Sequence, residues 1–247
     1  MSLKELHEGA IFVADSHYGP WRTSFVDFLR AVESGKIQTR QLILMGDNSD
    51  LLFGPISETS RLNQELIPLL NSLSEKMEIL YLEGNHDFRL ASVFPNILVV
   101  PRNQQPLMMR YGTEKIALLH GDIGVPLGYE LYTALIRNRP LLYTLNVINT
   151  LLGGAIIKWL SDDMQGKNHC QKIENFETIA RRHSGSKWIH ECDIVIEGHY
   201  HQNKSFDFDA YRYINLGAFA CNERVYVVKS LQDRLVLDEA MFHKEPK

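Results

Sequence analysis

The chain has 247 residues, of which 45% are hydrophobic and 23% are charged, and its formal net charge at pH 7 is -4. A chain of this length and composition buries a full core, which excludes a disordered protein, and its acidic balance argues against a protein that coats nucleic acid. Within this acidic body, residues 124–190 carry eight Lys and Arg against five Asp and Glu, so this segment has a net charge of +3.

The N-terminal residues contain no apolar segment typical of a signal peptide, which predicts a cytoplasmic protein. The three cysteines, Cys170, Cys192 and Cys221, are widely spaced, so we expect neither a disulfide framework nor a thiolate zinc site. Residues 140–157 are uncharged, but polar residues and a Gly-Gly pair interrupt them, and they fall short of the roughly 20 apolar residues that span a bilayer. We therefore expect no transmembrane helix.

Apolar runs that end in a polar turn recur five times along the chain. The runs cover residues 11–14, 42–45, 79–82, 116–119 and 194–196, and each predicts a buried strand. The turns that follow them are Asp15-Ser16-His17, Gly46-Asp47-Asn48-Ser49-Asp50, Gly84-Asn85-His86-Asp87, His120-Gly121-Asp122 and Gly198-His199-Tyr200-His201.

Helical patterns separate the first three of these strands. Residues 20–35 place four apolar side chains on one face, and residues 62–73 repeat leucines at helical spacing, with a bend expected at Pro68. The alternation of strand and helix is typical of a layered α/β sheet, whose polar sites gather at the carboxyl ends of the strands. Additional strands are predicted at residues 97–100, 107–109, 211–216 and 224–228.

Residues 129–183 have a helical pattern of their own. Apolar residues recur at spacings of three or four from Leu141 to Trp159, and a later helix is expected from about Asn168 to Arg182. The apolar stripe either packs on the domain's own core or forms a cap that faces a lipid substrate or a membrane surface. We predict a core of residues 1–123 and 191–247 with a helical lid at residues 124–190.

The residue types in the five turns suit a pair of divalent cations. Two such ions, roughly 3.5–4 Å apart, neutralise phosphate oxygens and lower the pKa of a water from about 15.7 towards 7. Asp47 is placed to bridge the two ions, and His and Asn as the other main ligands keep the centre positive for a phosphate. Five of the ten histidines lie in these turns, whereas His7, His169, His183, His190 and His243 are expected at the surface or in helices.

The motifs Asp-x-His, Gly-Asp-x-x-Asp, Gly-Asn-His-Asp, His-Gly-Asp and Gly-His-x-His, in this order, resemble those of the calcineurin-like metallophosphoesterases over residues 11 to about 220. The resemblance implies an α/β fold, a four-layer αββα sandwich with a helical cap insertion. It also implies that the first metal is bound by Asp15, His17 and His201, the second by Asn85, His120 and His199, and both by Asp47.

His86 resembles the family's histidine that acts on the substrate, and Asp50 is expected to orient it, so these two are the predicted catalytic residues. Asn85 and His86 are also expected to contact the substrate. Asp87 and Asp122 are expected to hydrogen-bond around the ligands rather than to bind metal. The ligand types accept Mn²⁺, Fe²⁺, Co²⁺ or Zn²⁺, and the resemblance favours Mn²⁺.

The chain length, the basic and apolar insertion and the Gly84-Asn85-His86-Asp87-Phe88 turn are similar to the family members that hydrolyse UDP-2,3-diacylglucosamine to the lipid sugar 1-phosphate and UMP in lipid A synthesis. The similarity implies a lipid-linked nucleotide sugar as substrate and peripheral contact with the cytoplasmic face of the inner membrane. The best-known of these members carry Arg where this chain has His86. Candidate diphosphate ligands, each with a solvated helix face as the alternative role, are Lys167, Lys172, Arg181 and Arg182.

Other functions stay open. A phosphoesterase of the same family that acts on a nucleotide, cyclic nucleotide or phosphoprotein would share the five motifs and differ in what residues 124–190 contact. A binding module without activity would be expected to lose a ligand or His86, and this chain keeps them all. A nuclease would need a basic groove with stacking aromatics, for which a net charge of +3 is too small, so we expect no nucleic-acid partner.

Overall fold

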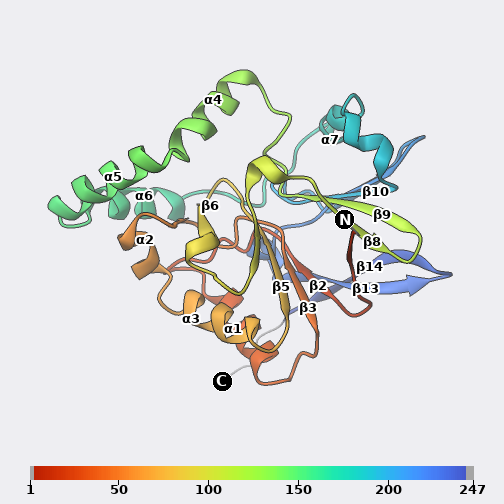
Figure 1. Ribbon diagram of the computed structural model, residues 1–247, viewed down its shortest axis with the longest axis horizontal. Helices are drawn as coiled ribbons and strands as arrows, with labels where there is room; N and C mark the ends of the chain where they lie inside the picture. The colour runs from red at the N-terminus through yellow and green to blue at the C-terminus, as the bar shows by residue number, and fades with distance from the viewer. Residues whose placement is uncertain (1–2, 243–247) are drawn as a thin grey trace.

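The structure, a computed structural model, describes residues 3–242 and contains two six-stranded sheets (Figure 1). The first sheet has the order β14-β13-β2-β3-β5-β7, with β2 (Ile11–Val13), β3 (Gln41–Leu44), β5 (Glu78–Leu82), β7 (Leu98–Val100), β13 (Arg224–Leu231) and β14 (Arg234–Met241). The second has the order β1-β8-β9-β10-β12-β11, with β1 (Lys4–Glu5), β8 (Leu107–Tyr111), β9 (Glu114–Leu119), β10 (Ile194–Glu197), β11 (Lys204–Asp207) and β12 (Arg212–Asn215). A two-stranded sheet joins β4 (Leu52–Phe53) to β6 (Asp87–Phe88).

The alternation of side chains along the strands sets the layers. In β3, Leu42 and Leu44 face the helices α1 (Ser24–Glu33) and α3 (Leu66–Ser74), whereas Ile43 faces the core between the two sheets. In β9, Ile116 and Leu118 enter that same inter-sheet core from the other side. The remaining face of the second sheet packs on α7 (Phe176–Ala180) and the 3-10 turn η4 (Lys187–Glu191). The predicted four-layer αββα sandwich is confirmed.

The helical pattern around Pro68 forms two helices rather than one bent helix. Residues 63–65 separate α2 (Ser57–Leu62) from α3, and the Asn63 side chain caps the end of α2 by donating from Nδ2 to the Leu51 and Thr59 carbonyls. Pro68 lies in the first turn of α3, where its missing N–H costs nothing. The other short helical elements are η1 (Leu90–Ser92), η2 (Arg102–Gln104), η3 (Arg181–His183) and α8 (Phe219–Asn222).

The long apolar stripe is also divided. It forms α5 (Arg139–Leu151) and α6 (Ala155–Gln165), which follow α4 (Leu127–Ile136). Gly153 and Gly154 both have positive φ, and the two helices are bent by 99° at this break. Figure 1 shows α4, α5 and α6 to one side of the sheets, near α2 and β6. Leu142 and Ile157 are buried there against Ile56 and Phe88.

In residues 3–242 we find no single helix with the length and apolar character needed to cross a membrane. The pair α5 and α6 passes the length and composition test only when taken together across the bend. The division into a core and a lid at residues 124–190 stays a prediction.

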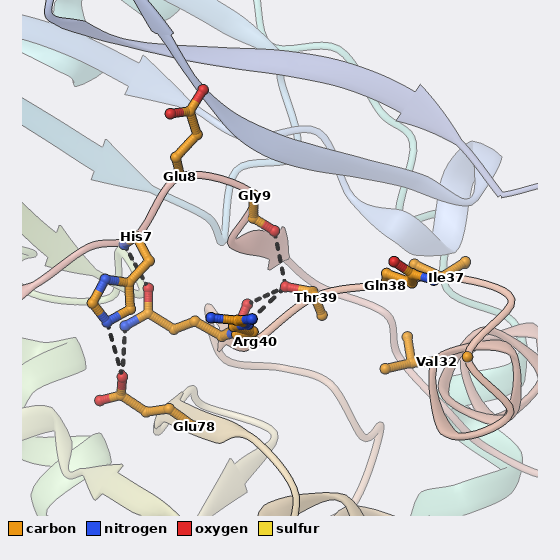
Figure 2. A pocket seen from close by; sticks show the side chains of 11 residues that line it. His7, Glu8, Gly9, Val32, Ile37, Gln38, Thr39, Arg40 and Glu78 are labelled. Carbon is orange, nitrogen blue, oxygen red and sulfur yellow. Dashed lines mark hydrogen bonds and ion pairs between the residues drawn. The ribbon is translucent and has the colours of Figure 1, made fainter.

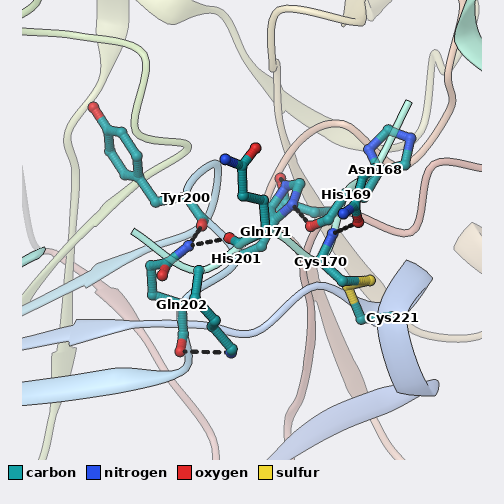
Figure 3. The surroundings of a disulfide bond; sticks show 10 residues. Asn168, His169, Cys170, Gln171, Tyr200, His201, Gln202 and Cys221 are labelled. Atoms are coloured by element: carbon teal, nitrogen blue, oxygen red, sulfur yellow. Dashed lines mark hydrogen bonds and ion pairs between the residues drawn. A yellow bond between two sulfur atoms is a disulfide. The ribbon is translucent and has the colours of Figure 1, made fainter. Parts of the chain in front are cut away.

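Residues 168–175 do not form the helix expected from Asn168. Only α7 and η3 are helical in that region, and Asn175 before them has a left-handed φ of 53°. Cys170 forms a disulfide with Cys221 of α8 (Figure 3), so the expectation of no disulfide is wrong for this pair. This bond and hydrogen bonds to Gln202 hold the segment in a non-helical path.

Candidate metal centre

The five polar turns meet at one edge of the two sheets. The strands β2, β3 and β5 are parallel neighbours in the first sheet, and β9 and β10 are parallel neighbours in the second. The carboxyl ends of parallel neighbours lie at the same edge of a sheet, which brings together turns that are far apart in the sequence.

The residues predicted for the first cation lie in contact. Nε2 of His201 is 3.1 Å from Oδ1 of Asp15, and the His17 and His201 ring centroids are 5.3 Å apart. One ligand atom from each of Asp15, His17 and Asp47 lies within 4.8 Å of the others. These distances suit ligands of a single ion.

The residues predicted for the second cation form an adjoining group. Nε2 of His120 is 3.4 Å from Oδ2 of Asp47 and 3.3 Å from Oδ1 of Asn85. Asp47, His120 and His199 each offer one ligand atom within 4.8 Å of the others, so Asp47 belongs to both groups. A bridging carboxylate requires this arrangement.

Three of the predicted ligand histidines contact an oxygen atom through Nδ1. Nδ1 of His17 lies 2.9 Å from Oδ1 of Asp50, Nδ1 of His120 2.9 Å from the Met45 carbonyl, and Nδ1 of His201 2.6 Å from the His169 carbonyl. The Met45 and His169 carbonyls accept the Nδ1 protons of His120 and His201, so Nε2 of these two histidines is the nitrogen that faces Asp47 and Asp15. Nε2 of His17 is buried without a hydrogen-bond partner among the described residues. Two Nε2 atoms directed at carboxylates and one buried nitrogen without a partner fit the ligands of divalent cations.

The pKa values of the residues in this centre are set by their burial and by the charges of their neighbours. Burial opposes ionisation of Asp47, but His120 and His86 lower the pKa of its carboxyl well below the usual value. Burial likewise disfavours a charged His120, yet the Asp47 carboxylate raises the pKa of this histidine well above the usual value. Burial and the neighbouring His120 lower the pKa of His199 to about 4, so this imidazole is neutral and available as a ligand near neutral pH.

The backbone around the ligands is strained. Asp15, His17, Asp47, His199 and His201 all have φ between 47° and 62°, the left-handed region that non-glycine residues rarely adopt. Such strain persists where the surrounding structure fixes it, commonly at functional sites. A Cβ on Gly84 would lie 2.6 Å from the Asp47 main-chain nitrogen, so the close approach of these two turns requires a glycine.

His86 and Asp50, the predicted catalytic residues, lie beside the centre and contact each other through the main chain of Asp50. Nδ1 of His86 lies 3.0 Å from the main-chain carbonyl of Asp50, whereas the Asp50 carboxylate binds His17. Burial raises the pKa of Asp50 to about 7, against the opposing charge of Arg22. Asp50 therefore orients two histidines, one through its main chain and one through its side chain.

Two further aspartates support the turns from behind. The Asp87 carboxylate accepts from the main-chain N–H groups of Asp47, Asn48 and Gly84 and from the Tyr81 hydroxyl. Asp122 is fully buried and pairs with Arg102 at 2.9 Å and with Arg137 at 3.2 Å. These contacts agree with the expectation that both carboxylates hydrogen-bond around the ligands.

The four candidate cations of the insertion have different surroundings. Lys167 is half-exposed and 3.9 Å from Asp163, Lys172 donates to the Gln202 carbonyl at 3.4 Å, and Arg181 pairs with Glu177 on the surface. Arg182 is mostly buried, where it pairs with Glu197, donates to the Gly121 carbonyl and lies over the Tyr200 ring. Arg182 thus connects the insertion to the turns that carry His120 and His199.

Sequence reasoning missed three residues near this edge. His169 was expected at the surface or in a helix, but its ring centroid lies 3.9 Å from that of His17. His183 lies in a helix, η3, as expected, but its contact with the buried Glu197 was not foreseen. Arg137, 8% exposed, donates to the Gly84 carbonyl, and its Nε and Nη1 have no hydrogen-bond partner among residues 3–242. The signal available in the sequence was an arginine directly after the apolar residues of α4. His243 lies outside the described residues.

A pocket of about 780 Å³ lies elsewhere (Figure 2). Its lining includes His7, Thr39 and Glu78, and Glu78 is the first residue of β5, so the pocket is at the amino ends of the strands. The pocket contains none of the residues predicted for the metals or for catalysis.

The layered fold and its cluster of Asp, His and Asn side chains define a class of protein, the metal-dependent phosphoesterases. Comparison with known proteins assigns the chain to the same class. The profile of the calcineurin-like phosphoesterase family matches residues 10–213. The chain belongs to this family, so the predicted hydrolase class is confirmed.

Two curated relatives have the name UDP-2,3-diacylglucosamine hydrolase. The protein from Photorhabdus laumondii is 28% identical over 117 residues, 45% of this chain and 47% of the relative, so this match spans about half of that protein's length. The protein from Aliivibrio fischeri is 21% identical over 80% of this chain and 83% of the relative.

Solved structures are more distant. Yfce, a phosphoesterase from E. coli, is 13% identical with a TM-score of 0.42 over 95% of this chain and 99% of its own. A Streptococcus pneumoniae protein described as a predicted phosphoesterase is 15% identical with a TM-score of 0.46 over 95% of this chain and 89% of its own.

Proposed function

We propose that this chain is a dinuclear metal-dependent phosphoesterase that hydrolyses the diphosphate of UDP-2,3-diacylglucosamine to the lipid sugar 1-phosphate and UMP. The observation that carries the phosphoesterase chemistry is Asp47, whose carboxylate belongs to two adjoining groups of ligand atoms. The names of the two curated relatives support the particular substrate.

The proposed ligands are Asp15, His17 and His201 for one cation, Asn85, His120 and His199 for the other, and Asp47 for both. When bound, divalent ions, Mn²⁺ in this proposal, would neutralise the phosphate oxygens and lower the pKa of the attacking water. In the reaction, the water oxygen would bond to one phosphorus and the bridging P–O bond would break, and the proton that the water loses would balance the one gained by the departing phosphate oxygen.

His86 is proposed to deliver a proton to the departing phosphate oxygen. Its Nδ1 proton is held by the Asp50 carbonyl, so Nε2 points away from that carbonyl and is the atom available to the substrate. Arg137 is proposed to contact the diphosphate, because its buried guanidinium lies against the Gly84 carbonyl with Nε and Nη1 unpartnered. Lys167 and Lys172 are proposed as outer phosphate contacts.

The helices α4 to α6 are proposed as a lid for the acyl chains. Leu127, Leu131 and Leu135 fall four residues apart on α4 and are all more than 60% exposed, as are Leu151 and Trp159 beyond them. Apolar surface of this extent in a family of phosphate hydrolases suits a substrate with fatty acyl chains. Peripheral contact of the same surface with the cytoplasmic face of the inner membrane is part of this proposal.

The test uses metal-stripped protein reloaded with Mn²⁺. It should hydrolyse bis(4-nitrophenyl) phosphate and UDP-2,3-diacylglucosamine, and UMP release from the acylated substrate should exceed that from UDP-N-acetylglucosamine. Asp47→Ala should abolish both reactions, and Asp209→Ala, at an exposed bend, should change neither. His86→Gln should keep metal binding but lower kcat by about 10²- to 10⁴-fold.

Activity on the aryl ester alone would replace the acylated substrate with another phosphate ester, such as a nucleotide or phosphoprotein. A protein that binds Mn²⁺ but hydrolyses neither substrate would be a binding module of the same fold. Absence of Mn²⁺ binding would overturn the metal centre itself.

A further inference from the structure

His169 comes from the insertion, yet its side chain lies against the residues proposed for the first cation. Its ring centroid is 3.9 Å from that of His17 and 6.1 Å from that of His201. One ligand atom from each of these three histidines lies within 4.8 Å of the other two. The three imidazoles therefore meet the same distance requirement as Asp15, His17 and Asp47.

Several contacts fix the His169 segment at this place. The His169 carbonyl accepts from Nδ1 of His201 at 2.6 Å, and the next residue, Cys170, is bonded to Cys221 of α8 (Figure 3). Gln202 donates to the Gln171 carbonyl at 3.0 Å and accepts from the Ile173 N–H at 2.8 Å. Hydrogen bonds from both main-chain and side-chain atoms thus join the His169 segment to the turn that carries His201.

The ring of His169 also lacks a partner for a buried nitrogen. Its Nε2 is buried without a hydrogen bond among the described residues, as is Nε2 of His17. A buried imidazole nitrogen is normally hydrogen-bonded or bound to a metal. The two rings are neighbours, so one cation between them would satisfy both nitrogens.

We propose that His169 is a further ligand of the cation held by Asp15, His17 and His201, an inference that rests on the metal centre of the proposed function. With the bridging Asp47, this position would have five protein ligands, three of them imidazoles. Imidazole suits Co²⁺, Fe²⁺ and Zn²⁺ better than it suits Mn²⁺, whereas carboxylate ligands suit Mn²⁺. The first position would therefore favour the nitrogen-preferring metals more than the second.

The test compares two variants of the full-length protein. His169→Ala removes the ring, and His169→Phe keeps an aromatic ring against His17 but has no ligand nitrogen. Metal-stripped protein is titrated with Co²⁺ and with Mn²⁺ by calorimetry, and the visible absorption of bound Co²⁺ is recorded. His190→Ala is the matched control, because His190 is an exposed histidine in η4.

Wild-type protein and His190→Ala should bind two Co²⁺ ions with the same affinities and spectrum. Both His169 variants should bind one of the two Co²⁺ ions at least about tenfold more weakly, with an altered Co²⁺ absorption band. Mn²⁺ affinity should fall less than Co²⁺ affinity, because the lost ligand is an imidazole.

Wild-type affinities and spectrum in His169→Phe would overturn the inference and leave His169 a packing role. Wild-type protein that binds no Co²⁺ would instead overturn the metal centre of the proposed function. If His169→Ala does not fold, His169→Phe still decides the question, because it retains the ring contact with His17.

Discussion

Nδ1 of His17 lies 2.9 Å from Oδ1 of Asp50, and both side chains are buried. This contact fixes the histidine with its Nε2 lone pair towards the metal centre. Asp50→Ala should weaken binding of the first cation by about 10- to 100-fold, the cost typical of losing such an orienting carboxylate. Calorimetric titration with Mn²⁺ measures the change. Asp50→Asn keeps a hydrogen-bond acceptor and should lose less metal affinity than Asp50→Ala. Equal Mn²⁺ affinities in wild-type protein, Asp50→Ala and Asp50→Asn would contradict the orienting role of Asp50.

Gly84 allows the Asp47 and Asn85 turns to approach closely. In Gly84→Ala the new Cβ would come within 2.6 Å of the Asp47 main-chain nitrogen, so we expect lost metal binding and about 1–3 kcal/mol of destabilisation. Gly128→Ala is the matched control, since no atom lies within 4 Å of its added Cβ and it lies in helix α4. Metal content and urea unfolding are the measurements, and a Gly84→Ala protein with both metals bound would contradict the close approach.

Glu197 is a buried carboxylate that pairs with Arg182, His183 and the Tyr213 hydroxyl. Burial opposes its ionisation, but Arg182 and His183 lower its pKa below the usual value. Because the folded pKa is lower than the unfolded one, the stabilisation is complete above the unfolded pKa and is lost as pH falls through the folded pKa. Glu197→Gln should cost about 3–5 kcal/mol at neutral pH, because Arg182 stays buried without a counter-charge.

Urea unfolding of wild-type protein and Glu197→Gln at several pH values measures this cost and its dependence on pH. The difference in unfolding free energy between wild-type protein and Glu197→Gln should shrink as pH falls below the usual glutamate range. Glu177→Gln, which breaks the exposed pair with Arg181, is the control and should change stability by about 1 kcal/mol or less. Equal effects of the two substitutions would show that the buried network does not stabilise the fold.

The disulfide between Cys170 and Cys221 joins residues 51 apart in the sequence. Reduction should lower the free energy of unfolding by about 4 kcal/mol, because the cross-link restricts the unfolded chain over a loop of this length. Urea unfolding with and without a phosphine reductant measures this difference. The reductant should have no effect on Cys170→Ser, and its having no effect on wild-type protein would mean that the bond is absent in solution.

The exposed leucines of α4 test the lid. Leu131→Glu with Leu135→Glu should lower kcat/KM for the acylated nucleotide sugar at least about tenfold, by loss of apolar contact with the acyl chains. Hydrolysis of the aryl ester, which has no acyl chain, should be unchanged. Leu231→Glu, an equally exposed leucine at the end of β13, is the control. Equal activity of the lid variant on the acylated substrate would remove α4 from the substrate site.

The sequence by itself determined the strands and the turns that follow them. An apolar run of three or four residues followed by a turn with Asp, Asn or His is a local pattern, and strands that are buried on both faces need no distant information to be recognised. Parallel neighbours then bring their carboxyl ends to one edge, so the meeting of Asp15, Asp47 and His120 could be predicted. The helix breaks at residues 63–65 and 152–154 were harder to place from the sequence, because the side-chain cap of Asn63 and two positive φ angles decided them.

Only the tertiary structure decided which residues meet across the insertion. Neither His169 beside His17, nor the bond between Cys170 and Cys221, nor Arg137 beneath the Gly84 carbonyl follows from any spacing in the chain. These contacts join residues 50 or more positions apart, and those of His169 and Cys170 depend on the path of residues 168–175, which have no regular secondary structure. Local periodicity specifies strands and helices, but the position of an irregular segment is set by the surface on which it packs.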